Sequence, residues 1–222
     1  MSERGPLVGA VTLPKPYFQD EAVTIYHADC REILPLLEPG SVDLVLTDPP
    51  YGIGRDGQRP STSSHGGHKG YEFLGWDSQR PSIDDFVSMM NKTRNLIVWG
   101  GQYFADLLPP SRCWLIWDKG QRIDQADAEL AWTTLDMPVR IYTLNRVALQ
   151  GDGAKHPTQK PLSLIRWCLG FFPNAQLVLD PFMGSGTTLR AAKDLGRKAI
   201  GIEIEECYCE IAAKRMSQGV LL

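Results

Sequence analysis

The chain alternates between short apolar runs and longer segments in which apolar residues recur every three or four positions. The short runs are rich in β-branched and aliphatic residues, as strands are, whereas the longer spacing is typical of helices that pack one face on a core. Strands are predicted at 23–27, 42–47, 95–99, 113–117, 139–144, 177–180 and 198–202, and helices near 29–37, 83–94, 103–108, 161–172, 187–195 and 205–216. This alternation predicts an α/β fold with a doubly wound, mainly parallel sheet, in a single domain covering residues 1–222 with 1–20 as an N-terminal extension.

The run Val42–Leu46 leads into the tetrapeptide Asp48-Pro49-Pro50-Tyr51. Two consecutive prolines cannot continue a strand or a helix, so the chain must turn here. Ligands of open α/β sheets bind outside the carboxyl ends of the strands, so the carboxylate and the aromatic ring are expected at a reaction site. The alternative is a plain Asp-Pro turn with a tyrosine on the surface.

A second junction between a strand and a loop lies at Leu177–Asp180 and is followed by the turn Pro181–Thr188. The two glycines of this turn can adopt positive φ, which lets a ligand approach the backbone and the N-terminus of the next helix. Glu203 ends the next predicted strand, where an acid commonly holds ribose hydroxyls. The full G-x-G-x-x-G spacing is absent, which disfavours a dinucleotide, and Phe182 as a core residue or Glu203 as a solvated acid remain open.

Together these motifs resemble those of amino-group DNA methyltransferases, and their order resembles the circularly permuted β group, in which the catalytic motif precedes the S-adenosylmethionine motif. His156–Pro161 is similar to the family segment that leads a helix toward the methionine end of the cofactor, and Ile25–Cys30 is similar to a strand that ends near the adenine. The resemblance covers residues 23 to 215. It implies the fold of S-adenosylmethionine-dependent methyltransferases, with one antiparallel strand in a seven-stranded sheet.

The resemblance also implies which residues bind S-adenosylmethionine, with no metal. The larger set of residues includes the glycine-containing turn and would surround the adenosine part of the cofactor. The smaller set would lie near its methionine part. The larger set is Asp29, Asp180, Phe182, Gly184, Ser185, Gly186, Thr187 and Glu203, and the smaller set is Thr158 and Lys160.

The catalytic roles follow from the chemistry of the acceptor. An exocyclic base amine is a poor nucleophile because its lone pair is delocalised into the ring. The Asp48 side chain and the Pro49 carbonyl could accept both amine hydrogens and return the lone pair to nitrogen, while Pro50 fixes that carbonyl. Tyr51 would offer a stacking face for the base, which must leave the duplex to be reached. Positioning is then expected to carry most of the rate, without a metal or a covalent enzyme intermediate.

Composition narrows the class of protein further. Five cysteines without a Cys-x-x-Cys pair argue against a disulfide framework or a thiolate zinc site and favour a reducing cytosol. No apolar stretch is as long as a membrane span, and the first residues lack the apolar region of a signal peptide. A cytoplasmic protein without a membrane partner is therefore expected. His65 and His68 have the spacing of metal ligands, but nothing nearby completes a site.

Residues 52–82 combine glycines, cations and aromatic residues and cannot build a core of their own. They form either a disordered surface insertion or a mobile loop that recognises DNA, and the second is favoured because long loops in compact domains are usually functional. The net charge of the chain is −3, yet residues 139–166 carry five cations against Asp152 alone. DNA contacts are predicted at Arg55, Arg59, Lys69, Arg146 and Lys155, although cations can equally decorate a solvated face.

Asp48 also bears on the target base. In the family, Asp at this position accompanies adenine-N6 methylation more often and Ser usually accompanies cytosine-N4 methylation. The chain is therefore predicted to be a site-specific DNA adenine-N6 methyltransferase, with cytosine-N4 as the alternative and a catalytically silent DNA-binding subunit as a weaker one. Asn145–Lys155 is too short for a sizeable target-recognition region, so base reading must come from 52–82, from a second subunit or from few contacts. Expected partners are DNA, a second copy in a homodimer and a cognate restriction enzyme of a restriction-modification system.

Overall fold

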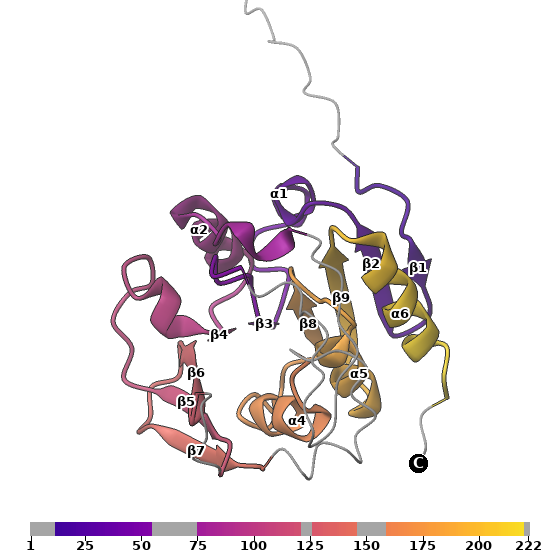
Figure 1. Ribbon diagram of the computed structural model, residues 1–222. Coiled ribbons are helices and arrows are strands. Elements are labelled where there is room, and N and C mark those ends of the chain that lie inside the picture. The colour runs from indigo at the N-terminus through magenta and orange to yellow at the C-terminus, as the bar shows by residue number, and fades with distance from the viewer. Residues whose placement is uncertain (1–11, 55–74, 121–125, 146–158, 220–222) are drawn as a thin grey trace, which may run out of the picture.

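The computed structural model describes residues 12–54, 75–120, 126–145 and 159–219. Within them, nine strands form one sheet in the order β1-β2-β9-β8-β3-β4-β6-β5-β7 (Figure 1). Their bounds are β1 Phe18–Gln19, β2 Val23–His27, β3 Leu44–Thr47, β4 Leu96–Trp99, β5 Trp114–Asp118, β6 Ala128–Thr133, β7 Arg140–Thr143, β8 Leu177–Asp180 and β9 Lys198–Glu203. Since β1 and β6 alone among these strands run against their neighbours, the prediction of a mainly parallel sheet is confirmed.

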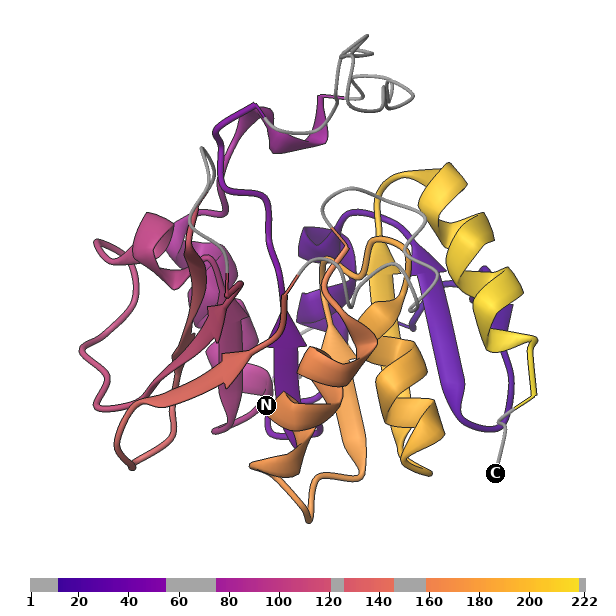
Figure 2. The same cartoon turned by 60° about the horizontal axis from the view of Figure 1, so that its bottom comes forward.

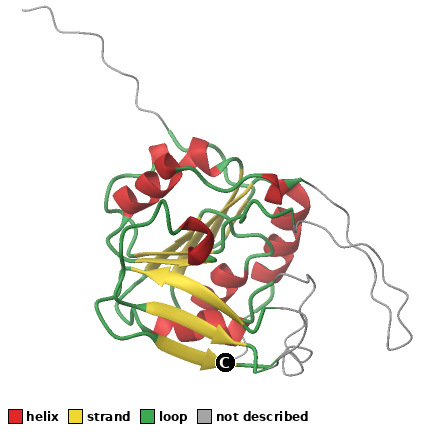
Figure 3. Cartoon of the chain, turned by 60° about the vertical axis from the view of Figure 1, so that its left-hand side comes forward, coloured by secondary structure: helices red, strands yellow, loops and turns green. Residues whose placement is uncertain are grey.

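Helices cover both faces of this sheet (Figures 2 and 3). Their bounds are α1 Cys30–Ile33, α2 Ile83–Lys92, α4 Leu162–Gly170, α5 Thr187–Asp194 and α6 Glu206–Met216. Buried side chains of α4, α5 and α6 belong to one core cluster, and those of α1 and α2 belong to a second. The prediction of a doubly wound fold is therefore confirmed as well.

The central strands explain why this layering could be predicted from apolar runs. All four residues of β3 are buried, and so are all four of β4. Leu44 and Leu46 pack in the first cluster, whereas Val45, between them, packs in the second. Side chains alternate across a strand, so a strand that is covered on both faces must be apolar at every position.

Three local predictions differ from the structure. Residues 103–108 form no α-helix; Gly101–Phe104 form a 3-10 helix that follows Gly100, which is in the left-handed region. Strand β6 was not predicted, since its alanines and Glu129 have low strand propensity. Pairing with β4 on one side and β5 on the other holds it in the sheet. The seven-stranded sheet with one antiparallel strand that the resemblance implied also differs, because nine strands are described, and both β6 and the edge strand β1, at the end of the 1–20 segment, are antiparallel to their neighbours.

Candidate functional site

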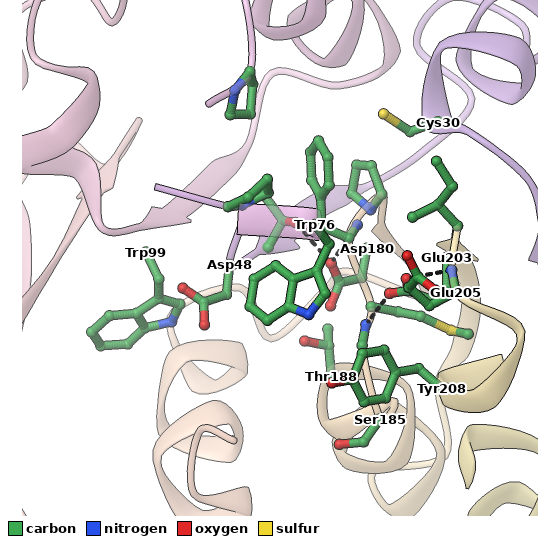
Figure 4. Close-up of a pocket in the computed structure, with 18 of the residues that line it drawn as sticks. Cys30, Asp48, Trp76, Trp99, Asp180, Ser185, Thr188, Glu203, Glu205 and Tyr208 are labelled. Carbon is green, nitrogen blue, oxygen red and sulfur yellow. Dashed lines mark hydrogen bonds between the residues drawn. The ribbon is translucent and has the colours of Figure 1, made fainter. Parts of the chain in front are cut away.

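Four acids follow four neighbouring strands at one edge of the sheet. Asp29 follows β2, Glu203 ends β9, Asp180 ends β8 and Asp48 follows β3, and these strands are parallel neighbours in that order. All four acids line a single cavity of about 450 Å³, and Figure 4 labels Asp48, Asp180 and Glu203 among them. This volume is within the range of about 300–1,000 Å³ found for small-molecule sites. The cavity lies where ligands bind in open α/β sheets.

The glycine-turn side of the cavity is the region formed by Asp180–Thr188 and Glu203. Gly184 has φ of +50° and donates its backbone N–H to Glu203 Oε2 at 2.9 Å. Gly186 has φ of +77°, and a Cβ there would lie 3.0 Å from the Cβ of Ala212 on α6. Both positions therefore favour glycine, the second also for lack of space. Beside Gly184 a Cβ would meet no chain atom within 4 Å, so crowding by the protein does not explain that glycine.

Two acids of this side are buried, and burial raises the pKa of each. Glu203 is 9% exposed, and burial raises its pKa to about 7, although the backbone N–H of Gly184 and that of Glu205 donate to it. Asp180 is 3% exposed, and burial raises its pKa to about 6. Its Oδ1 accepts a 2.7 Å hydrogen bond from Thr47 Oγ1, one residue before Asp48. Asp180 thus ties the glycine turn to the strand that carries Asp48.

The remaining predicted binders on this side also line the cavity. Asp29 caps α1 and forms an ion pair with Arg31, which lowers the pKa of its carboxyl. Phe182 lines the cavity while packing against the second core cluster, so the two interpretations do not exclude each other and its contact with a cofactor stays a prediction. Arg215 of α6 donates to the backbone oxygen of Ser185 at 2.9 Å and to Thr187 Oγ1 at 3.3 Å.

The Asp48 side of the cavity is the region formed by Asp48–Tyr51, Trp99 and Lys160. Asp48 Oδ1 accepts a 2.5 Å hydrogen bond from the Tyr51 hydroxyl, and its Oδ2 forms an ion pair with the Lys160 ammonium. Burial by itself would lower the pKa of Lys160, but the charges of Asp48 and Glu129 raise it well above its usual value. In this structure the Lys160 ammonium therefore binds the Asp48 carboxylate. Pro50 lines the cavity and Pro49 is buried.

Tyr51 is not a free surface residue. Its ring stacks on Tyr103 with centroids 4.7 Å apart and planes inclined by 20°. A Cβ at Gly100, where φ is +69°, would lie 2.0 Å from Tyr51 Cε1. The Trp99-Gly100-Gly101 sequence after β4 was the signal for this packing, and our sequence analysis missed it. The surface-turn interpretation is wrong, and one face of the ring is already occupied.

Sequence analysis also missed the contact between Asp77 and the backbone that follows Asp48-Pro49-Pro50. Asp77, 2% exposed, accepts hydrogen bonds at its Oδ1 from the backbone N–H of Tyr51 at 2.6 Å and of Gly52 at 2.9 Å. Its neighbour Trp76 lines the cavity and lies between Asp48 and Tyr208 in the view of Figure 4. The end of the predicted 52–82 loop therefore belongs to the cavity wall.

Glu129 and Lys119 extend the ion pair of Asp48 and Lys160 into a row of four charged side chains. Glu129 Oε2 lies 3.1 Å from Lys160 Nζ, and its Oε1 lies 2.6 Å from Lys119 Nζ. Burial alone would raise the pKa of Glu129, but the two lysines lower it to about 2. Lys119 follows an apolar strand directly, which was an available signal, whereas Glu129 lies on the strand that was not predicted.

Several predicted residues lie outside the described part of the chain. They are the DNA contacts Arg55, Arg59, Lys69, Arg146 and Lys155, the cofactor residue Thr158, and the pair His65 and His68. Among the residues that the structure describes, no cluster of His, Cys, Asp and Glu could hold a metal ion. No helix within 12–54, 75–120, 126–145 or 159–219 is long and apolar enough to cross a membrane.

Comparison with known proteins relates this cavity to enzymes that modify DNA. Residues 109–214 match the DNA methylase family. The protein is 27% identical to the type II methyltransferase M2.LlaDCHI of Lactococcus lactis subsp. cremoris, in an alignment that covers 95% of each chain. Its fold matches the structure of M1.HpyAVI in complex with SAM, with a TM-score of 0.55, 25% identity and coverage of 88% of this chain and 100% of the other. It also matches the cytosine-N4-specific PvuII DNA methyltransferase, with a TM-score of 0.62, 18% identity and coverage of 94% and 91%.

Proposed function

We propose that the chain, part of which matches the DNA methylase family, transfers a methyl group from S-adenosylmethionine to the exocyclic N6 amine of an adenine flipped out of DNA. One observation carries the proposal. The Asp48 carboxylate and the glycine-turn side line the same cavity, so an acceptor amine and a nucleoside-containing cofactor can meet there. The family order of motifs, with the catalytic one first, is present in this chain.

The glycine-turn side carries hydrogen-bond acceptors and open space that would suit S-adenosylmethionine. When bound, this cofactor supplies an electrophilic methyl group on a sulfonium. Glu203 would accept hydrogen bonds from the ribose hydroxyls, and Asp29 would lie near the adenine. Gly184 fits this role because its α-carbon faces open space rather than protein, which leaves room for a ligand. Phe182 would pack along the cofactor, within the turn that leads to α5.

On the other side, Asp48 would accept one hydrogen of the target amine and the Pro49 carbonyl the other. These two hydrogen bonds favour a tetrahedral nitrogen, which localises the lone pair for attack. The Tyr51 hydroxyl holds Asp48 Oδ1 at 2.5 Å and so restricts the rotation of the carboxylate. Because Tyr51 already stacks on Tyr103, we assign it a role in holding Asp48 and leave at most one face of its ring to the base.

Adenine is favoured over cytosine by the carboxylate at position 48, since the cytosine-N4 branch usually carries Ser there. The two amines pose nearly the same chemical problem, so cytosine-N4 is the alternative. DNA phosphates would bind the cations assigned from sequence, Arg55, Arg59, Lys69, Arg146 and Lys155. A second copy of the chain and a cognate restriction enzyme are the proposed partners, as in a restriction-modification system. A cytoplasmic location follows from that role.

The test is to incubate the protein with unmethylated genomic DNA and S-adenosylmethionine that carries an isotopic label in its methyl group. The DNA is then digested and the labelled nucleoside identified by mass spectrometry. Label in N6-methyldeoxyadenosine supports the proposal, and label in N4-methyldeoxycytidine retains the mechanism but changes the base. Absence of label, with cofactor binding intact, would count against DNA as the acceptor.

A further inference from the structure

Four charged side chains of alternating sign extend from the cavity into the protein. In order they are Asp48 after β3, Lys160 before α4, Glu129 on β6 and Lys119 after β5. Asp48 and Lys160 are among the residues that line the cavity, whereas Glu129 and Lys119 are not among the described residues that do so. The inner pair can therefore act on a ligand only through the outer pair.

Stability alone is a weak explanation for this row. The side chains of Lys160 and Lys119 are 8% and 9% exposed, so both ammonium groups have lost most of their hydration. Desolvation of buried ion pairs commonly cancels their attraction, and apolar residues of similar size often serve stability equally well. The rings of Trp99 and Tyr51, with centroids 5.6 Å and 5.9 Å from Lys160 Nζ, further limit access of water to this ammonium.

The three hydrogens of the Lys160 ammonium have three acceptors. One is Asp48 Oδ2, one is the Tyr51 hydroxyl oxygen at 3.3 Å, and one is Glu129 Oε2 at 3.1 Å. An ammonium carries three donors, so this set uses its full capacity. Glu129 thus takes a share of a charge that would otherwise be balanced by Asp48 alone.

We propose that Glu129 is a positioning residue for methyl transfer: it shares the Lys160 ammonium with Asp48 and so preserves the capacity of Asp48 to accept a hydrogen bond from the target amine. Lys119 neutralises the second oxygen of Glu129 and keeps it ionised. The inference rests on the proposed function, because it assigns the amine to Asp48. It adds a residue on β6 that touches neither substrate nor cofactor.

The first experiment compares Glu129→Gln with Glu210→Gln, an exposed glutamate on α6 whose side chain is 62% exposed. For each variant, kcat and the KM for DNA are measured, and the cofactor Kd is determined by calorimetry. Glu129→Gln is expected to lower kcat about tenfold, the size of a coupling between contacting residues, with KM and Kd within about twofold. Glu210→Gln is expected to match the unaltered protein.

A double-mutant cycle shows whether Glu129 acts through Lys160. In a Lys160→Met background, Glu129→Gln is expected to have no further effect on kcat, because the shared ammonium is gone. If Glu129→Gln alone folds poorly, Glu129→Gln/Lys119→Met removes one charge of each sign. That variant is expected to fold and to show the same loss of kcat.

Two results would overturn the inference alone: full kcat for Glu129→Gln in an active protein, or a loss confined to the DNA KM or the cofactor Kd. The latter would mean that Glu129 acts on a bound ligand. An unaltered protein that methylates no nucleic acid would instead overturn the proposed function, and this inference with it.

Discussion

The glycine-turn side and the Asp48 side of one cavity are held by different kinds of interaction. On the first, backbone groups dominate: Gly184 N–H donates to Glu203, and two glycines adopt positive φ. On the second, charged side chains from segments far apart in the sequence dominate, and Asp48 meets Lys160 across 112 positions. The glycine-turn side, which backbone groups hold, should tolerate changes of charge better than changes of shape. The Asp48 side, which charged side chains hold, should tolerate changes of shape better than changes of charge. Substitutions can therefore separate binding from turnover.

The largest effect is expected from Asp48→Asn, which keeps the shape of the side chain and removes its charge. A neutral amide with one acceptor oxygen in place of a charged carboxylate with two should lower kcat by about a hundredfold or more, because the acceptor at the reacting nitrogen is weakened. Cofactor affinity, measured by calorimetry, should change little because the glycine-turn side is untouched. A parallel loss of cofactor binding would show that the two sides are not separable.

The complementary change is Gly184→Val, which should weaken cofactor binding by more than about tenfold. The new side chain would project toward the cavity and would hold a β-branched residue at φ of +50°. Gly196→Val is the matched control, since Gly196 also has positive φ, at +71°, with no chain atom near its Cβ, but lies outside the cavity lining. Equal affinities for the two variants would place the cofactor elsewhere.

A smaller effect, on stability, should follow from Gly100→Ala, because its Cβ would collide with the ring of Tyr51. Gly40→Ala has nearly the same φ, +68°, and meets nothing within 4 Å. Both variants lose about 1–2 kcal/mol from left-handed backbone. Overpacking should cost Gly100→Ala about 1–3 kcal/mol more in the free energy of unfolding, measured by urea denaturation. Identical losses would mean that Tyr51 moves aside freely.

The smallest effect is expected in the pH dependence of cofactor affinity. Burial raises the pKa of Glu203 to about 7, so the carboxyl gains its charge as pH rises from 6 to 8. An ionised carboxylate is the better acceptor for ribose hydroxyls, so affinity should rise over that interval by up to about tenfold, following the ionised fraction. The stability of the fold should change with pH in the opposite direction. Because the pKa of this carboxyl is raised in the folded protein, the free energy of unfolding falls as pH rises from about 4.5 toward 7. Glu203→Gln should bind more weakly and lose the pH dependence, whereas a retained slope would assign it to Asp180.

Local rules account for what could be predicted from the sequence. Apolar runs and the proline and glycine signals after them indicated the parallel strands, and hence the edge at which Asp29, Asp48, Asp180 and Glu203 gather. These features depend on neighbours within a few residues, where the steric limits of proline and glycine and the alternation of side chains suffice. The resemblance to amino-group methyltransferases rested on the same segments.

Tertiary structure alone decided the rest. Strand β6 has weak propensity and forms because β4 and β5 pair with both its edges, and this places Glu129 beside Lys160. The hydrogen bond that Asp77 accepts from the backbone of Tyr51, and the packing of the Tyr51 ring against Gly100, likewise join segments that no local pattern connects. Sequence by itself determined which acids stand at the strand ends, because backbone geometry is local. Which cations neutralise them depended on the three-dimensional packing, because electrostatic partners are chosen by distance in space rather than along the chain.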